Sequence, residues 1–222
     1  MGDDVRADEL HGGGSDSSPF SKHVALLADA GRVFYGRKWV LGTGGNFSAV
    51  VNREPLRLLI TASGAEKGSL APEDFVQVGV SGEVLCGGGM PSAETALHLA
   101  VVSTRRAEAV FHTHSVWSTL ISDEHAADGG LFIENYEMLK GLSGVTTHEH
   151  REWLPIIENT QRWPDAIPRL EAILTSRRDV HGFLVLRHGL YTWGRSIAEA
   201  RRHVEILEFL LEVVGRTRCG RR

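Results

Sequence analysis

The stretch Ala109-Val110-Phe111-His112-Thr113-His114-Ser115 is the one from which the rest of the chain can be interpreted. Apolar residues lead into it and a helix-compatible segment follows, so it predicts a strand over 109–114 that ends at a functional edge. Side chains alternate along a strand, so His112 and His114 point to the same face. Two imidazoles that converge from one strand suit zinc and neighbouring transition metals. Histidines also occur in cores as hydrogen-bonded residues, and that alternative stays open for the pair alone.

The composition is that of an ordinary globular domain. A chain of 222 residues suits one medium domain with a sizeable core, and 42% hydrophobic with 23% charged residues is typical of soluble proteins. The net charge of -4 gives no basic footprint, so nucleic acid is not expected as a partner. The count of 11 histidines is high for this length and is compatible with a metal-binding or acid–base role.

The cysteines and the N-terminal residues indicate the cellular compartment to expect. Cys86 and Cys219 form neither a disulfide framework nor a Cys-x-x-Cys metal site, so a reducing cytoplasm is the simplest expectation. The chain begins Met1-Gly2-Asp3-Asp4, without the basic and apolar regions of a signal peptide. No apolar run approaches the length of a membrane span, so no membrane partner is expected.

The chain divides into one domain and two tails. Residues 1–18 are rich in Gly, Asp and Ser and are expected to form a disordered N-terminal tail, whereas 216–222 form a short basic tail. Helical and extended patterns alternate over the intervening residues 19–215, which predicts an α/β fold with a central mixed sheet covered by helices on both faces. The expected helices are 19–37, 92–104, 115–121, 133–141, 165–177 and 196–214, and the expected strands or buried extended stretches are 47–51, 56–61, 74–80, 83–86, 109–114, 154–157, 182–186 and 190–193.

Two glycine-rich turns precede the His strand. The first contains Gly44-Gly45-Asn46, and the second, Thr61 to Gly68, carries Ser63-Gly64 and Lys67. Glycines allow open turns whose N–H groups gather around an anion, although a tight turn without a ligand is the alternative for each. Two such loops in one small domain favour a phosphate site.

A third imidazole and two carboxylates complete the set of candidate site residues. His188 ends a nearly all-apolar strand, beside a glycine turn, which suits a third metal ligand. Glu94 lies in the first turn of the helix that Ser92 caps, so it either complements the helix dipole or reaches the histidines as a ligand or base. Glu137 is able to pair with Lys140 one turn on.

The second His-x-His is interpreted differently from the first. His148 and His150 lie in a very polar stretch beside Glu149, Arg151 and Glu152, which predicts an exposed loop rather than a pair of ligands.

Together these motifs resemble the class II aldolase/adducin family over roughly Pro19 to Val214. The resemblance implies a three-layer α/β/α fold, one Zn²⁺ per subunit on His112, His114 and His188, and a homotetramer with active sites between subunits. It also implies that Glu94 lies at the metal and that the loop residues hold the phosphate of a small sugar phosphate. The motifs, in the family's order, are Gly44-Gly45-Asn46, Ser63-Gly64, Pro91-Ser92-Ala93-Glu94, His112-Thr113-His114 and Arg187-His188-Gly189, and the implied phosphate contacts are Gly45, Asn46, Ser63, Gly64 and Ser92, with Lys67 beside them.

Within that family the chain is most similar to the zinc-dependent sugar-phosphate dehydratases, in which the carboxylate at the position of Glu137 is the general acid/base. Ala93 stands where the aldolases usually carry a second serine, which disfavours the aldolase alternative. A sugar-phosphate aldolase, a 4-epimerase and a non-catalytic adducin-like module remain the alternatives. The similar stretches are 61–68, 134–141, 155–160 and 187–194.

Overall fold

Strand β5 (Ala109–Thr113) is buried along its whole length, and its side chains alternate between two helical layers. Ala109 and Phe111 pack in one cluster with residues of α1 (Pro19–Gly36) and α5 (Ile197–Cys219). Val110 packs on the opposite face with residues of α2 (Thr95–Arg105) and α4 (Trp163–Ser176). A strand that is apolar on both faces must be covered on both, which determines the three-layer arrangement.

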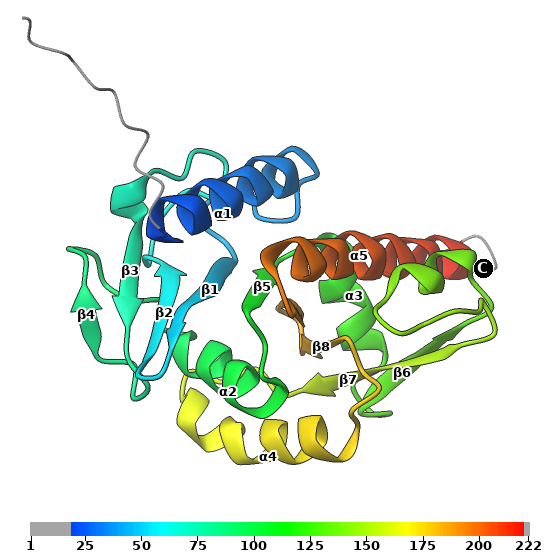
Figure 1. Ribbon diagram of the computed structural model, residues 1–222. Helices are drawn as coiled ribbons and strands as arrows, with labels where there is room; N and C mark the ends of the chain where they lie inside the picture. Colours follow the sequence, from blue (N-terminus) through cyan, green and yellow to red (C-terminus); the bar gives the residue numbers. More distant parts are fainter. Residues whose placement is uncertain (1–18, 220–222) are drawn as a thin grey trace, which may run out of the picture.

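The computed structural model describes residues 19–219, in which nine strands form one sheet in the order β4-β3-β2-β1-β5-β9-β8-β7-β6. Neighbouring strands are antiparallel except β7 and β8, so the sheet is mixed. The expected fold class is therefore confirmed (Figure 1). The remaining elements are β1 (Asn46–Arg53), β2 (Leu56–Thr61), β3 (Phe75–Val78), β4 (Val84–Cys86), α3 (Val116–Glu124), β6 (Gly130–Glu134), β7 (Arg151–Ile157), β8 (Gly182–Val185), β9 (Gly189–Gly194) and two short 3₁₀ turns, η1 (Pro72–Asp74) and η2 (Glu137–Gly141).

Helices α1, α3 and α5 cover one face of the sheet, and α2 and α4 pack side by side on the other (Figure 1). Ser115 caps α3, since its Oγ accepts a hydrogen bond from Ser118 N at 3.0 Å. This cap lets the chain turn into a helix directly after the His strand. Among residues 19–219, no helix combines the length and apolarity needed to cross a bilayer.

Two expected segments differ in the structure. The helix expected over 133–141 is wrong in its first part, because β6 occupies Gly130–Glu134 and only η2 is helical. Leu131 and Ile133 are buried while Phe132 and Glu134 are exposed, a period of two that the short stretch concealed. Helix α5 also continues past Val214 to Cys219, whereas the tail expected over 1–18 and the last three residues lie outside the described part.

A buried carboxylate ties β7 to the loop that follows η2. Glu152 is fully buried and receives hydrogen bonds from His150 Nε2 (2.8 Å), His181 N (2.9 Å) and His181 Nδ1 (3.0 Å). His181 Nε2 faces the carbonyl oxygen of Ser143 at 2.8 Å. Both ring nitrogens of His181 therefore face acceptors, which fits an imidazolium. His150 lies at the end of the expected loop but is half-buried against Glu152, whereas His148 is exposed as expected.

The buried contact between Glu152 and His181 makes the free energy of unfolding depend on pH. Burial lowers the pKa of His181, but the hydrogen bond and charge of Glu152 outweigh it, so the pKa stands above its ordinary value of 6.5. The stabilisation is therefore full below pH 6.5 and is lost as pH rises through the pKa of folded His181. Glu152→Gln should cost about 3 kcal/mol at low pH and flatten that dependence, as measured by urea unfolding at several pH values. Parallel curves for the two proteins would contradict this assignment.

Candidate active site

One row of side chains crosses four strands beneath the surface and positions one of the three histidines. The strand register places Asn46 of β1 opposite His112 of β5, His112 opposite Tyr191 of β9, and Tyr191 opposite Phe183 of β8. The Tyr191 ring stacks on His112 with centroids 4.0 Å apart and on Phe183 at 4.8 Å. The imidazole of His112 is thus held by cross-strand packing.

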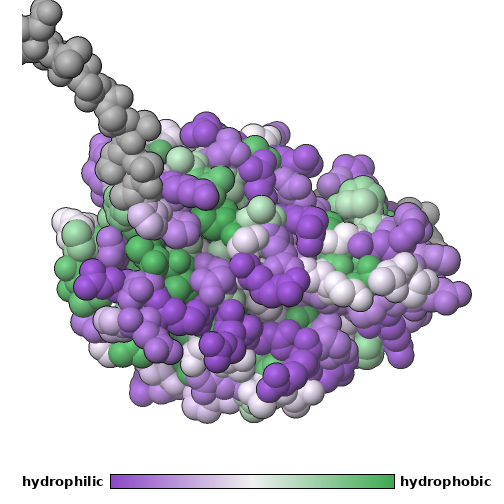
Figure 2. Space-filling view, viewed as in Figure 1, coloured by the Kyte–Doolittle hydropathy of each residue, from purple (hydrophilic) through white to green (hydrophobic). Residues whose placement is uncertain are grey.

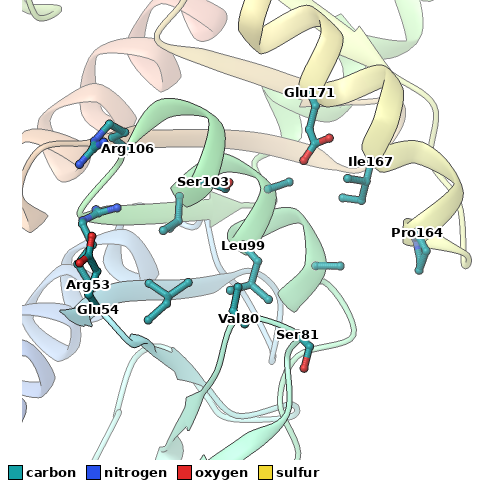
Figure 3. A pocket seen from close by; sticks show the side chains of 14 residues that line it. Arg53, Glu54, Val80, Ser81, Leu99, Ser103, Arg106, Pro164, Ile167 and Glu171 are labelled. Atoms are coloured by element: carbon teal, nitrogen blue, oxygen red, sulfur yellow. The ribbon is translucent and has the colours of Figure 1, made fainter.

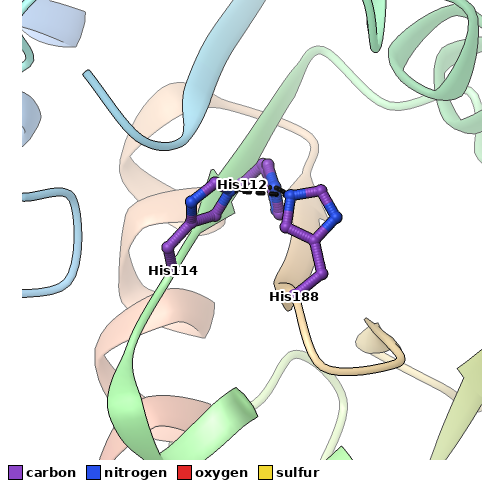
Figure 4. Close-up of side chains that lie close together, drawn as sticks. All are labelled: His112, His114 and His188. Carbon is purple, nitrogen blue, oxygen red and sulfur yellow. Dashed lines mark hydrogen bonds between the residues drawn. The ribbon is translucent and has the colours of Figure 1, made fainter. Parts of the chain in front are cut away.

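Three imidazoles converge at His112 of this row (Figure 4). His112 and His114 come from the end of β5, and His188 comes from the turn between β8 and β9. Their Nε2 atoms lie 2.7 Å apart for His112 and His114, 3.0 Å for His114 and His188, and 3.3 Å for His112 and His188. Ligand nitrogens around a tetrahedral zinc ion lie roughly 3.3 Å apart, so the three atoms form one face of such a site.

The surroundings favour neutral imidazoles with free lone pairs. Burial is the first cause that lowers the pKa of all three, and charge repulsion among them adds to it for His112 and His114; the pKa of His112 is well below its ordinary value and that of His114 is about 4. Nδ1 of His112 lies 3.0 Å from the carbonyl oxygen of Leu190 and must donate to it, which leaves Nε2 as the unprotonated atom. A histidine ligand typically donates its other N–H to a carbonyl in this way. The donor set therefore fits a divalent metal such as zinc.

Glu94 lies beside the three histidines, as one of the two interpretations of the sequence expected. Its carboxylate oxygens are 3.4 Å from His112 Nε2 and 3.3 Å from His188 Nε2. Asn46 Nδ2 donates to it at 2.6 Å, and Glu94 itself is 8% exposed. Helix α2 begins at Thr95 instead of directly after Ser92, so Glu94 occupies the N-cap position, from which its side chain reaches the histidines.

A cavity of about 340 Å³ opens over the histidines and Glu94. Its walls bring together side chains from all five sequence motifs, which lie far apart along the chain. Gln161, just before α4, and Trp163, its first residue, also line the cavity and were not expected from the sequence. The other lining residues are Thr43, Gly44, Gly45, Asn46, Ala62, Ser63, Gly64, Lys67, Ser92, Ala93, Glu94, His114 and His188.

Gly45 explains why the first loop is glycine-rich. Its φ is +73°, and a Cβ at this position would lie 2.5 Å from the carbonyl oxygen of His112. Only glycine allows the loop to pass this close to the strand that carries His112.

Lys67 joins the two glycine-rich loops. It is 1% exposed, and its Nζ donates to the carbonyl oxygens of Thr43 and Ala65, each at 2.7 Å. Burial lowers the pKa of Lys67 to about 8. An ammonium has three N–H donors, so one remains beside the cavity. Lys67 therefore fixes the shape of the two loops. The phosphate contact expected from the sequence stays a prediction.

Glu137 is the expected site residue that this chain does not bring to the cavity. It opens η2, its side chain is 74% exposed, and Lys140 Nζ lies 2.6 Å from its carboxylate. The hydrogen bond and charge of Lys140 lower the pKa of Glu137. The local pairing suggested by the sequence is thus present.

Two buried residues of the site were missed in the sequence. His98 contacts Asn46 and lies four positions after Glu94, a spacing that places both on one face of α2. Tyr191 was assigned only to a strand, although burial and the nearby Glu94 carboxylate raise its pKa well above the ordinary value. The helical spacing of His98 from Glu94 was a usable signal, whereas Tyr191 depends on strand register.

A second hollow, of about 610 Å³, lies between α2, α4 and the turn joining β1 to β2 (Figure 3). Its lining is largely aliphatic, and Arg53 pairs with Glu108 at 2.7 Å. Among the described residues, no metal-ligand group lies in this hollow. The smaller cavity over the histidines is therefore the better candidate.

Comparison with known proteins agrees with this geometry. The family model described as class II aldolase and adducin N-terminal domain matches residues 25–214. The chain belongs to the class II aldolase and adducin family. Two proteins named methylthioribulose-1-phosphate dehydratase are similar over most of their length. That of Methylococcus capsulatus is 42% identical over 89% of this chain and 95% of its own, and that of Sorangium cellulosum is 39% identical over 90% and 94%.

Solved structures of class II aldolase-like proteins share the fold. YgbL from Escherichia coli, described as a putative aldolase/epimerase/decarboxylase, superposes with a TM-score of 0.71 and 26% identity over 88% of this chain and 89% of its own. L-fuculose-1-phosphate aldolase from Thermus thermophilus gives a TM-score of 0.72 at 21% identity over 90% and 96%. At that identity, the second comparison establishes the fold alone.

Proposed function

We propose that this protein dehydrates 5-methylthioribulose 1-phosphate to 5-methylthio-2,3-dioxopentyl phosphate in methionine salvage. The observation that carries the proposal is the convergence of three neutral imidazole nitrogens and the Glu94 carboxylate in one cavity. The name shared by the relatives that are 42% and 39% identical supports this substrate. Departure of water next to a carbonyl needs that carbonyl polarised and one proton removed, and the cavity has groups for both tasks.

His112, His114 and His188 would hold Zn²⁺, since all three Nε2 lone pairs face one point. A zinc ion bound there supplies Lewis-acid polarisation of the substrate's C2 carbonyl, which acidifies the neighbouring C3–H. The chain fixes the direction of one ligand through the His112 hydrogen bond to Leu190 O.

The two glycine-rich loops would anchor the substrate phosphate. Ser63, Gly64 and Ser92 line the same cavity as the histidines, and Lys67 has a third N–H donor left for an anion. With the phosphate held there, the sugar chain extends toward His188 and Glu94. Anchoring one end of the substrate fixes which carbon faces the carboxylate.

Two carboxylates would take part in the reaction, one in the proton transfers and one in positioning. A base removes the proton from C3, and an acid protonates the C4 hydroxyl, which leaves as water; the resulting enol then tautomerises to the diketone. Glu137 is the proposed general acid/base, because one carboxylate can accept a proton and then return it. Glu94 would orient the groups at the metal through its contacts with His112 and His188.

Glu137 would reach the cavity of a neighbouring copy in a homotetramer with active sites between subunits. Its exposure in the single chain supports this arrangement. Exposed apolar side chains support association as well: Val84 and Leu85 are exposed on β4, the strand at one edge of the sheet, and Figure 2 shows apolar surface on that side of the molecule. Clustered apolar surface of this kind commonly marks contacts between proteins.

The test is incubation of the zinc-loaded protein with methylthioribulose 1-phosphate, followed by mass spectrometry. Loss of one water is the expected result. A triose phosphate would instead indicate an aldolase, and a product of unchanged mass but altered sugar NMR spectrum would indicate a 4-epimerase. Unchanged substrate would contradict the dehydratase and favour a non-catalytic adducin-like role.

A further inference from the structure

A continuous chain of hydrogen bonds leads from two buried residues behind the cavity to residues that line it. It begins at Ser48 Oγ, which lies 2.7 Å from His98 Nδ1, and it continues from His98 Nε2 to Asn46 Oδ1. Asn46 Nδ2 then lies 2.6 Å from Glu94 Oε2 and 3.0 Å from Ser92 Oγ. Ser48 and His98 are fully buried, and neither lines the cavity.

The direction of each bond follows from the group at its end. Asn46 Nδ2 donates both to Glu94 Oε2 and to Ser92 Oγ, so the NH₂ of the amide faces these two oxygens and the amide oxygen faces His98. His98 Nε2 therefore carries a proton. Burial lowers the pKa of His98 to about 3, so the ring is neutral and Nδ1 accepts from the Ser48 hydroxyl. One tautomer of His98 is thus fixed.

The same chain determines which way Ser92 points. Its Oγ receives hydrogen bonds from Asn46 Nδ2 (3.0 Å) and from Glu94 N (3.2 Å). Both lone pairs are then occupied, which leaves the hydroxyl hydrogen as a donor toward the cavity that Ser92 lines. If the Asn46 amide turned over, its oxygen would face the Glu94 carboxylate and Ser92 would lose one donor.

We propose that His98 is a positioning residue, which holds the Asn46 amide so that Glu94 stays beside the histidines and Ser92 presents its hydroxyl to an anionic ligand. The inference rests on the proposed function for its link to catalysis, because it concerns the same cavity. The proton positions on His98 and Asn46 and the binding of an anion at Ser92 do not depend on which reaction is catalysed. His98 touches neither substrate nor metal ligand and acts through Asn46.

A matched pair of variants tests this role. The amide of His98→Gln lies near the position of Nε2 and can still donate to Asn46, whereas that of His98→Asn lies near Nδ1 and reaches only Ser48. We expect His98→Gln to retain activity within a few-fold and His98→Asn to lose roughly 10- to 100-fold in kcat/KM. Inorganic phosphate, titrated calorimetrically into each zinc-loaded protein, should bind about 10-fold more weakly to His98→Asn.

A merely structural role gives a different pattern. If His98 only fills space and satisfies Ser48, His98→Asn would be tolerated at least as well as His98→Gln, and this order would overturn the proposal. Nitrogen-15 NMR of the unmodified protein is the second measurement, because it needs no variant to fold. It should show His98 protonated at Nε2 alone from pH 5 to 9; an Nδ1–H tautomer or an imidazolium would also overturn it.

These results separate the inference from the proposed function. If the wild-type protein does not dehydrate methylthioribulose 1-phosphate, the difference in phosphate affinity and the NMR signature are still expected. If it does dehydrate the substrate but the two variants behave alike, only the role of His98 fails.

Discussion

His188→Ala is expected to lose its metal and its activity together. His188 supplies one of three converging Nε2 atoms from a turn, so its removal leaves only the two ligands at the end of β5. Structural and catalytic zinc sites rarely persist with two protein ligands. Metal content by mass spectrometry should fall from about one ion per chain to nearly none, and turnover should fall by at least about 1000-fold.

The matched control is His148→Ala, which removes an exposed imidazole outside the cavity. It should keep both the metal and the activity. Full metal retention in His188→Ala would show that the third ligand lies elsewhere in the chain.

Glu137→Gln should leave the metal bound but lower kcat by at least about 100-fold, the usual effect of removing a general acid/base. Gln has nearly the same shape as Glu but accepts no proton at neutral pH. Glu149→Gln, an exposed carboxylate in the following loop, is the matched control and should behave as wild type. Steady-state kinetics with metal analysis checks both. Normal turnover of Glu137→Gln would leave Glu94 as the carboxylate to test.

Mixed oligomers would reveal which chain supplies Glu137. Co-expressed chains carrying either His188→Ala or Glu137→Gln are each inactive alone. If Glu137 acts in a neighbouring copy, about a quarter of the sites in a random mixture would combine intact residues from both chains. Recovery of activity on mixing supports the shared site, whereas no recovery in mixed oligomers places Glu137 with its own histidines.

The sequence predicted the fold and most of the cavity because both depend on local patterns. The apolar run ending in His112 and His114 required a buried strand, and the run ending in His188 required another. The meeting of the three histidines depends on the sheet: β5 and β8 both run antiparallel to β9, which lies between them, so their carboxyl ends lie at the same edge. The cytoplasmic location and the roles of the site residues stay predictions.

Features that depend on register or on more than one chain were not accessible in this way. The Asn46–His112–Tyr191 row follows from strand pairing, and nothing in the local sequence shows that Lys67 folds back onto two carbonyl oxygens. Strand β6 was missed because five residues are too few to distinguish a period of two from one of 3.6. Glu137 lies away from its own cavity, a fact that only the tertiary structure reveals.

The stack of Phe183, Tyr191 and His112 links the chemistry to the packing of the interior. The His112 ring, one of the three proposed ligands, packs on Tyr191, which in turn packs on Phe183, so we expect a conservative change such as Phe183→Leu to alter the tilt of the His112 ring without contacting it. Selectivity among zinc, iron, cobalt and manganese depends on such geometry. Relatives that differ only in this interior layer would consequently differ in the ion they prefer, and metal preference could drift through substitutions that look like ordinary core variation.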